Sequence, residues 1–281
     1  MSCQAAVAGN LGVVTAVIAH QGDWLEAPGG LRPNSVDAVL AGLRAGADGA
    51  EFDVRRSADG AVVMHHDAHL GAADVAAGCG AREGTAVYAA KRADLGHLST
   101  LAELLDAARA WAGEAKGRSP VLNVELKDLP GEPGWDEPHT LAREVAQLLM
   151  DAGVGQWPGP GEDGPGEDGA GEDGAVRVVV SSFDPEALVE LHRQAPRLST
   201  GLLLAAGSNW RGAISRGGGW RALHPAHVDA GPELFSATSA AGLAVVPWTV
   251  DDTSRAVALA GMGAAGVITN RPRSVLAALG R

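Results

Sequence analysis

Three acidic residues of this chain lie at the ends of short apolar segments. Glu51 and Asp53 are two residues apart in GAEFDV, and Glu125 lies in VLNVELK. Because side chains alternate between the two faces of a strand, residues two apart point the same way. Three converging carboxylates would repel one another without a balancing cation, so they call for a divalent metal bound through oxygen. The sequence therefore predicts a metal site formed by these three residues.

Two histidines end apolar segments in the same manner. His20 closes the run VVTAVIAH just before Gly22, and His66 ends VVMHHD with Asp67 behind it. Imidazoles beside a metal indicate a general acid and a general base, and the whole set describes metal-assisted hydrolysis. His66 is favoured over His65, because neighbouring residues of a strand face opposite sides. The alternative for His20 alone is a hydrogen-bonded histidine of the core.

Two further residues are candidates for contact with a substrate. Lys127 follows Glu125 by two residues, and it either neutralises that carboxylate or binds a phosphate as a compact positive charge. Trp248 is either a core aromatic residue or, at the C-terminal end of a strand, part of the wall of a pocket. The residue pattern alone leaves both alternatives open.

The scaffold must bring the ends of several strands together. Short β-branched runs alternate with amphipathic helical patterns along most of the chain. Eight of these runs are predicted parallel strands, which end at His20, Asp53, Lys127, Phe183, Leu204, His224, Thr249 and Thr269. Alternation of this kind predicts an α/β fold, a TIM (β/α)8 barrel, whose functional residues lie at the C-terminal ends of the strands.

The segment VVMHHD does not belong to these eight strands. Parallel strands need a crossover of roughly a dozen residues, but only RRSADGA separates this segment from Val54. We therefore expect a short antiparallel excursion after the second strand, with a turn at Asp59 and Gly60. Such an excursion would deliver His66 to the mouth of the barrel.

The first helix has clear boundary signals. Either Asn34 or Ser35 caps its N-terminus, and Gly46 ends it. Thr100 and Glu103 form the pattern of a capping box before LAELLDAARAW.

Length and charge limit the alternatives. The chain has 281 residues and is 46% hydrophobic, which suits one barrel domain spanning residues 1–281. A net charge of −12 argues against a nucleic-acid or anionic-membrane partner. Three copies of Gly-Glu-Asp-Gly at 161–174 lie in a glycine-rich acidic segment, 158–175, that we expect to be a disordered loop. Its period does not fit a calcium-binding loop.

The remaining features favour a cytoplasmic protein. Cys3 and Cys79 are too few for a disulfide framework, and no stretch is apolar enough for stable membrane insertion. The N-terminus has no basic residue ahead of its apolar run, so it makes a poor signal peptide. The oligomeric state is not indicated.

Taken together, these segments resemble the glycerophosphodiester phosphodiesterase family, from His20 to about Pro272. AHQG is similar to the family's segment ending His-Arg-Gly. Residues 45–70 carry its Glu-x-Asp, Asp-Gly and His-Asp block, which is the most specific stretch. VLNVELK resembles the Glu-x-Lys segment, and VVSSFDPEAL, LHP, VVPWTVDD and GVITNRP resemble later blocks.

The resemblance implies a TIM barrel in which the three carboxylates bind one divalent cation, Ca²⁺ or Mg²⁺. The two histidines would act as acid and base, and Lys127 would bind the phosphate. Gln21, at the position of a family arginine, and Trp248, from its place at a strand end, are the further candidates for contact with the substrate. A small-molecule glycerophosphodiester would be hydrolysed to sn-glycerol 3-phosphate and an alcohol, as part of lipid and glycerol metabolism. The metal would act as Lewis acid and template.

Two departures from the family pattern stand out. Gln21 replaces the family's arginine, and glutamine cannot supply the charge with which arginine clamps a phosphate. The family's Pro-Glu-Asn-Thr appears here as residues 32–35, RPNS, which lacks the glutamate. Arg32 either compensates for the lost charge, or the activity is lowered, or the preferred diester is altered.

Two competing hypotheses follow. The first is a catalytically weakened barrel that binds glycerophosphodiesters without turning them over. The second is a different metal-dependent barrel enzyme that abstracts a proton next to a carboxylate. It would need a lysine or histidine base without a phosphate cradle.

Overall fold

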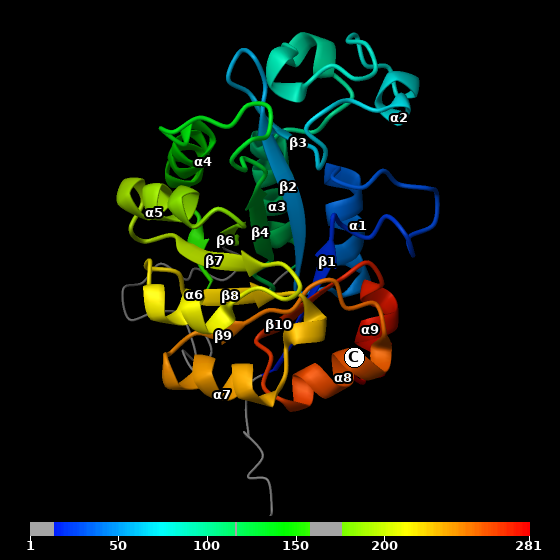
Figure 1. Cartoon of the computed structure of the whole chain (residues 1–281). Coiled ribbons are helices and arrows are strands. Elements are labelled where there is room, and N and C mark those ends of the chain that lie inside the picture. Colours follow the sequence, from blue (N-terminus) through cyan, green and yellow to red (C-terminus); the bar gives the residue numbers. More distant parts are fainter. Residues whose placement is uncertain (1–13, 116, 158–175) are drawn as a thin grey trace, which may run out of the picture.

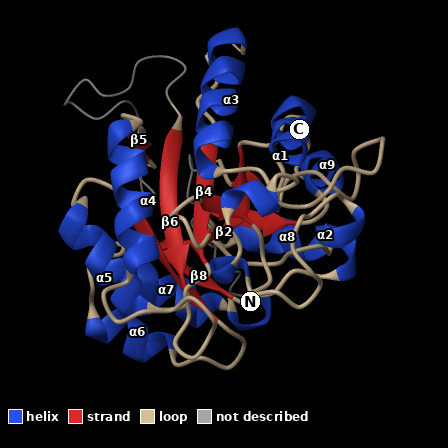
Figure 2. Cartoon of the chain, turned by 90° about the horizontal axis from the view of Figure 1, so that it is seen from above, coloured by secondary structure: helices blue, strands red, loops and turns tan. Residues whose placement is uncertain are grey.

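Parallel strands surrounded by helices form the body of the protein. The computed structural model describes residues 14–115, 117–157 and 176–281, so the acidic repeat at 161–174 lies outside the described residues. Helices surround the strands (Figures 1 and 2). The strands of the barrel are β1 (Ala16–His20), β2 (Gly49–Arg56), β4 (Val121–Leu126), β6 (Arg177–Ser182), β7 (Ser199–Leu204), β8 (Ala222–Pro225), β9 (Ala244–Val245) and β10 (Gly266–Thr269).

The sheet closes into a barrel. Neighbouring strands pair in parallel in the order β10-β1-β2-β4-β6-β7-β8-β9. The remaining seam, between the β9 segment and β10, is joined by backbone hydrogen bonds. The backbone amide of Ala265 donates to the carbonyl oxygen of Val245 at 2.9 Å. The backbone amide of Val250 donates to the carbonyl oxygen of Ile268 at 2.8 Å. The predicted TIM barrel is confirmed.

The helices that follow the strands cover the outside of the barrel. They are α1 (Val36–Ala45), α3 (Leu101–Glu114), α4 (Thr140–Asp151), α5 (Pro185–Gln194), α6 (Trp210–Arg216), α7 (Pro232–Ala240), α8 (Thr253–Gly261) and α9 (Pro272–Ala278). A two-residue strand, β5 (Gly155–Gln156), pairs with the start of β6. Among the helices of the described residues, none combines the length and the hydrophobicity of a membrane span.

The antiparallel excursion after the second strand is also confirmed. β3 (Val62–Met64) pairs antiparallel with the end of β2, with Val54 opposite Met64. The chain then forms α2 (Ala72–Ala76) and the short helices η1 (Val87–Ala89) and η2 (Arg92–Leu95) before it returns to α3. This part lies beyond one end of the barrel, where β2 reaches upward (Figure 1). A small apolar cluster of its own, which includes Val63, Leu70 and Leu95, holds it together.

The structure selects one of the two predicted caps of α1 and shortens one predicted strand. Ser35 caps α1, since its side chain accepts a hydrogen bond from the backbone amide of Ala38. Asn34 adopts a φ of 53°, and its side chain binds Asp53 instead of capping the helix. Only Ala244–Val245 of the run LAVVPWTV is a regular strand, because Pro247 has no amide hydrogen and interrupts the ladder. The predicted capping box of Thr100 and Glu103 is present.

The inside of the barrel is apolar at one level and polar at the other. Side chains near the N-terminal ends of the strands, such as Ile18, Val121 and Ala222, pack into one cluster, with Trp157 beside them. Closer to the C-terminal ends, the inward-facing positions of β2 and β4 are acidic.

Candidate active site

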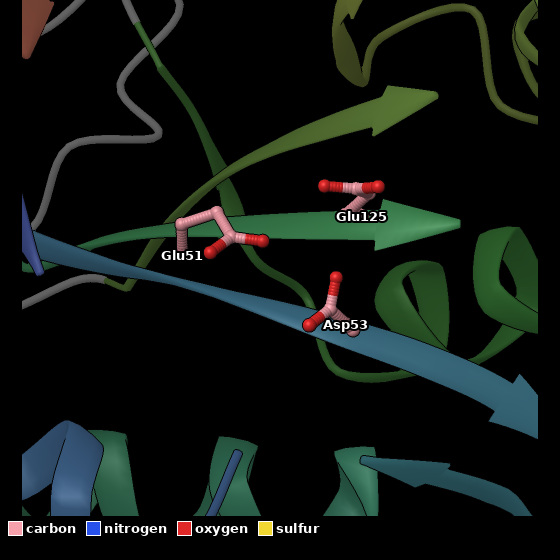
Figure 3. A group of neighbouring side chains, drawn as sticks. All are labelled: Glu51, Asp53 and Glu125. Atoms are coloured by element: carbon pink, nitrogen blue, oxygen red, sulfur yellow. The ribbon is translucent and has the colours of Figure 1, made fainter. Parts of the chain in front are cut away.

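The three predicted carboxylates converge inside the barrel. Glu51 and Asp53 extend from β2, and Glu125 extends from the neighbouring strand β4, where it is paired with Asp53 (Figure 3). One oxygen of each residue lies within 4.8 Å of one oxygen of each of the others. The residues are 2%, 1% and 7% exposed. We call Glu51, Asp53 and Glu125 the inner carboxylates.

The pKa values of this group show an excess of negative charge. Burial and the charges of Asp53 and Glu125 raise the pKa of Glu51 well above its usual range. Burial and the charge of Asp53 raise the pKa of Glu125 to about 7. Burial would raise the pKa of Asp53 as well, but attraction from Lys127 and other groups lowers it. Asp53 is therefore the member that holds its charge most firmly.

Lys127 is the cation closest to this excess charge. It follows the end of β4, and its Nζ lies 2.5 Å from Glu125 Oε1 and 3.2 Å from Asp53 Oδ1. Burial would lower the pKa of Lys127, but the charges of Glu125 and Asp53 raise it. One ammonium group opposite three carboxylates leaves the group short of positive charge.

Two amide side chains hold one oxygen of Asp53. Gln21 Nε2 donates to Asp53 Oδ2 at 2.7 Å, and Asn34 Nδ2 donates to the same oxygen at 2.8 Å. Asn34 Oδ1 in turn accepts from the backbone amide of Asp53 at 2.9 Å. The side chain of Gln21 thus contacts the acidic group, and its contact with a substrate stays a prediction. Sequence reasoning missed the contact of Asn34, because the residue precedes a helix and resembles a cap.

The inner carboxylates fit a hard divalent cation. Their oxygens are the donors that Ca²⁺ and Mg²⁺ prefer. No described residue donates a hydrogen bond to the buried atom Glu51 Oε1. Among the described residues, this is the group of acidic, histidine and cysteine side chains that converges closely enough to hold a metal. A buried divalent metal site is therefore what this arrangement supports.

His20 lies beside the inner carboxylates at the end of β1. Its Nε2 is 3.7 Å from Glu51 Oε2, and its Nδ1 is 2.7 Å from Asn270 Oδ1. The amide group of Asn270 donates to Asp251 Oδ2 at 2.9 Å, which turns the Asn270 oxygen toward the ring. A neutral His20 therefore carries its proton on Nδ1 and leaves Nε2 free. Burial lowers the pKa of His20, which favours this neutral form.

His65 and His66 follow the end of β3 and face different surroundings. The side chain of His66 is 54% exposed, and its Nδ1 lies 2.7 Å from Asp67 Oδ1. It is near enough to the inner group for its charge to lower the pKa of Asp53. The ring of His65 turns away, with Nε2 3.2 Å from Asp74 Oδ2 in the excursion. The ring of His65 thus contacts the excursion, whereas His66 acts electrostatically on Asp53, and its role as acid or base stays a prediction.

An aromatic pair lies next to Lys127. The rings of Phe183 and Trp248 meet edge to face, with centroids 5.5 Å apart, and Lys127 Nζ lies 6.0 Å from the centroid of Phe183. Trp248 Nε1 donates to the backbone oxygen of His224 at 2.8 Å, and the ring packs against the apolar interior. Trp248 therefore combines a core contact with a place near the mouth.

Two arginines near the site bind backbone oxygens and not the inner carboxylates. Arg32 donates to the backbone oxygen of His97 in the excursion, so its side chain is held there and does not contact the inner carboxylates. Arg55, which sequence reasoning missed, donates to the backbone oxygens of His66 and Lys127. The signal for Arg55 was its position two residues after Asp53, on the same face of β2.

A sequence model of the glycerophosphoryl diester phosphodiesterase family matches residues 20–148 and 166–274. The chain belongs to this family. Its members are hydrolases of glycerophosphodiesters, and the parts of the chain that match include all the predicted site residues. The resemblance inferred from the sequence motifs is confirmed.

Individual relatives agree with the family assignment. A glycerophosphodiester phosphodiesterase from Caldanaerobacter subterraneus is 28% identical over 264 residues, which cover 93% of this chain and 96% of the relative. Among solved structures, an Oleispira antarctica phosphodiesterase in complex with its product sn-glycerol-3-phosphate has a TM-score of 0.70 at 23% identity, covering 95% and 97% of the two chains. A glycerophosphodiester phosphodiesterase from Parabacteroides distasonis has a TM-score of 0.68 at 21% identity, with the same coverage. At these identities the structures support the fold.

Proposed function

We propose that this protein hydrolyses glycerophosphodiesters to sn-glycerol 3-phosphate and an alcohol, and that the reaction depends on one divalent cation, Ca²⁺ or Mg²⁺. The observation that carries the proposal is the convergence of three buried carboxylates beside His20, in a chain of this family. The Oleispira antarctica relative, which was solved with sn-glycerol-3-phosphate, supports the choice of product.

The inner carboxylates would hold the cation, which when bound acts as a Lewis acid toward a phosphate oxygen. Lys127 would contribute a second positive charge to the phosphate. It contacts Glu125 and Asp53, two of the carboxylates that would hold the cation, so its ammonium group lies where the phosphate would be bound. Gln21 and Trp248 remain the proposed further contacts of the substrate.

The two histidines would divide the proton transfers between them. His20 is half-buried, its lowered pKa favours the neutral form, and its Nε2 then carries no proton, so it suits the base that removes a proton from the attacking oxygen. His66 lies on the exposed side, paired with Asp67, where it suits the acid that protonates the departing alcohol. The proton taken by His20 balances the proton given by His66, and exchange with solvent would then restore the starting protonation of both rings.

Release of sn-glycerol 3-phosphate from a panel of glycerophosphodiesters tests the proposal. Purified protein should release this product with added Ca²⁺ or Mg²⁺ and should lose the activity in excess chelator. Turnover that persists in chelator, with no metal retained by the protein, would refute the metal dependence. Diester binding measured by calorimetry, without any turnover, would instead support the weakened barrel.

A further inference from the structure

Arg55 connects parts of the chain that are distant in sequence. It lies on β2, two residues after Asp53, and its side chain is buried. Its Nε donates to the backbone oxygen of His66 at 2.9 Å, and its Nη1 donates to the backbone oxygen of Lys127 at 2.9 Å. Both Nη1 and Nη2 also donate to Glu132 Oε2, at 3.0 Å each.

The shape of the guanidinium group suits this task. It presents its donors in a planar fork, whereas the single nitrogen of lysine cannot reach three acceptors in these directions. The side chain of His66 is 54% exposed and has little packing of its own. Contacts of its backbone are therefore important in fixing where the ring lies.

We infer that Arg55 is a positioning residue, which holds the backbone at His66 and Lys127 and so sets the place of both side chains relative to the inner carboxylates. This inference rests on the proposed function of His66 and Lys127. A displacement of about 1 Å in an active site can reduce turnover roughly 10²-fold. Loosening two such residues at once should therefore impair catalysis without removing any group that touches the substrate.

The next residue of the strand provides a matched control. Arg56 points to the other face of β2, where its Nε lies 2.8 Å from both carboxylate oxygens of Glu144 on α4. Arg56→Met removes an ion pair from the outside of the barrel, one position away from Arg55. Any general effect of losing an arginine from the end of β2 should appear in both positions.

The first experiment compares kinetics with stability. Arg55→Lys should lower kcat roughly 10- to 100-fold, with the melting temperature and the affinity for Ca²⁺, measured by calorimetry, close to those of the wild type. Arg56→Met should leave kcat close to that of the wild type, because the partly exposed ion pair with Glu144 that it removes contacts no residue of the site. Arg55→Met extends the series, and if it fails to fold, Arg55→Lys still provides the measurement. A wild-type kcat in Arg55→Lys would overturn the inference.

The second experiment separates positioning from a general structural role. If Arg55 acts through His66, Arg55→Lys should cost less turnover in a His66→Ala background than in the wild type. An equal cost in both backgrounds would count against the inference. Hydrogen exchange of peptides that contain His66 and Lys127 should be faster in Arg55→Lys. Unchanged hydrogen exchange in these peptides would refute the role of the backbone contacts of Arg55. A wild type that hydrolyses no diester would instead refute the proposed function.

Discussion

Two groups of carboxylates lie near the mouth of the barrel, and they differ in what their oxygens face. The inner carboxylates occupy strand positions, and their oxygens converge within 4.8 Å. The second group, Asp128, Asp136 and Asp184, follows the ends of strands and precedes helices. We call it the outer acidic group. The three outer residues influence one another electrostatically, since Asp136 and Asp184 both raise the pKa of Asp128.

The outer oxygens serve mainly to begin helices. Asp184 caps α5 by accepting from the amide of Glu186 at 2.9 Å. Asp136 accepts from both the amide and the hydroxyl of Thr140, at 2.8 and 2.6 Å. Among the described residues, the outer group does not bring three donor atoms together as the inner group does. The comparison teaches that convergence, and not the number of acids, distinguishes a metal site.

The largest expected effect comes from the inner group. Glu51→Gln, Asp53→Asn and Glu125→Gln should each weaken binding of Ca²⁺ or Mg²⁺ and lower turnover by at least about 10³-fold, since a metal supplies several kcal/mol of transition-state stabilisation. Calorimetry and product release measure the two effects. Asp136→Asn in the outer group serves as the control and should change neither by much. Equal losses in both groups would remove the distinction between them.

The histidines come next in size. His20→Ala and His66→Ala should each lower turnover by roughly 10²–10⁴-fold, the usual range for a lost general acid or base. His65→Ala is the matched control, because its ring contacts Asp74 in the excursion. It should cost far less turnover. A large effect at His65 together with none at His66 would show that the assignment of faces beyond β3 is wrong.

A smaller effect is expected at Gln21. Its amide donates to Asp53 at 2.7 Å, and an arginine in its place would add positive charge beside the phosphate. Gln21→Arg should therefore raise the affinity or turnover for glycerophosphodiesters modestly, because Lys127 and the proposed cation already supply positive charge to the phosphate. Steady-state kinetics on the panel measure the change.

The other outcomes at Gln21 are equally informative. Activity in Gln21→Arg combined with an inactive wild type would favour the weakened barrel. A loss of activity on the best substrate would instead identify Gln21 as a determinant of specificity.

The barrel and the inner carboxylates were predictable because each depends on local periodicity. Alternation along β2 puts Glu51 and Asp53 on one face, and the short link before β3 permits only an antiparallel return. The family motifs then assigned roles to residues already found. These signals lie within single segments of the sequence.

The supporting contacts were not predictable, because they join distant loops. Asn34 reaches Asp53 only because its backbone adopts a φ of 53°, and nothing in the residue type announces that conformation. Asn270 orients His20 across 250 residues of sequence. The bonds of Arg55 likewise depend on where two loops end in space. Tertiary geometry decides all three contacts.

The last prediction concerns the stability of the outer acidic group. Burial and the neighbouring carboxylates raise the pKa of Asp128 to about 7. An acid with a raised pKa in the folded state contributes stability fully below its unfolded pKa, near 4, and loses it as the pH rises through the folded value. Wild-type stability should therefore fall between about pH 4 and pH 7 because of this residue.

Asp128→Asn should remove that part of the pH dependence. At pH 8 the variant should be more stable than the wild type by about 1 kcal/mol or more, with little difference at pH 4. Urea unfolding across this range measures the effect, and comparison with the wild type cancels the contribution of Glu125, whose pKa is also raised. Asp136→Asn keeps one acceptor oxygen but replaces the other, so it loses one of its two bonds to Thr140 and should instead destabilise the fold across this pH range. A less stable Asp128→Asn at pH 8 would show that the ionised carboxylate has a favourable partner, and the outer group would then resemble the inner one.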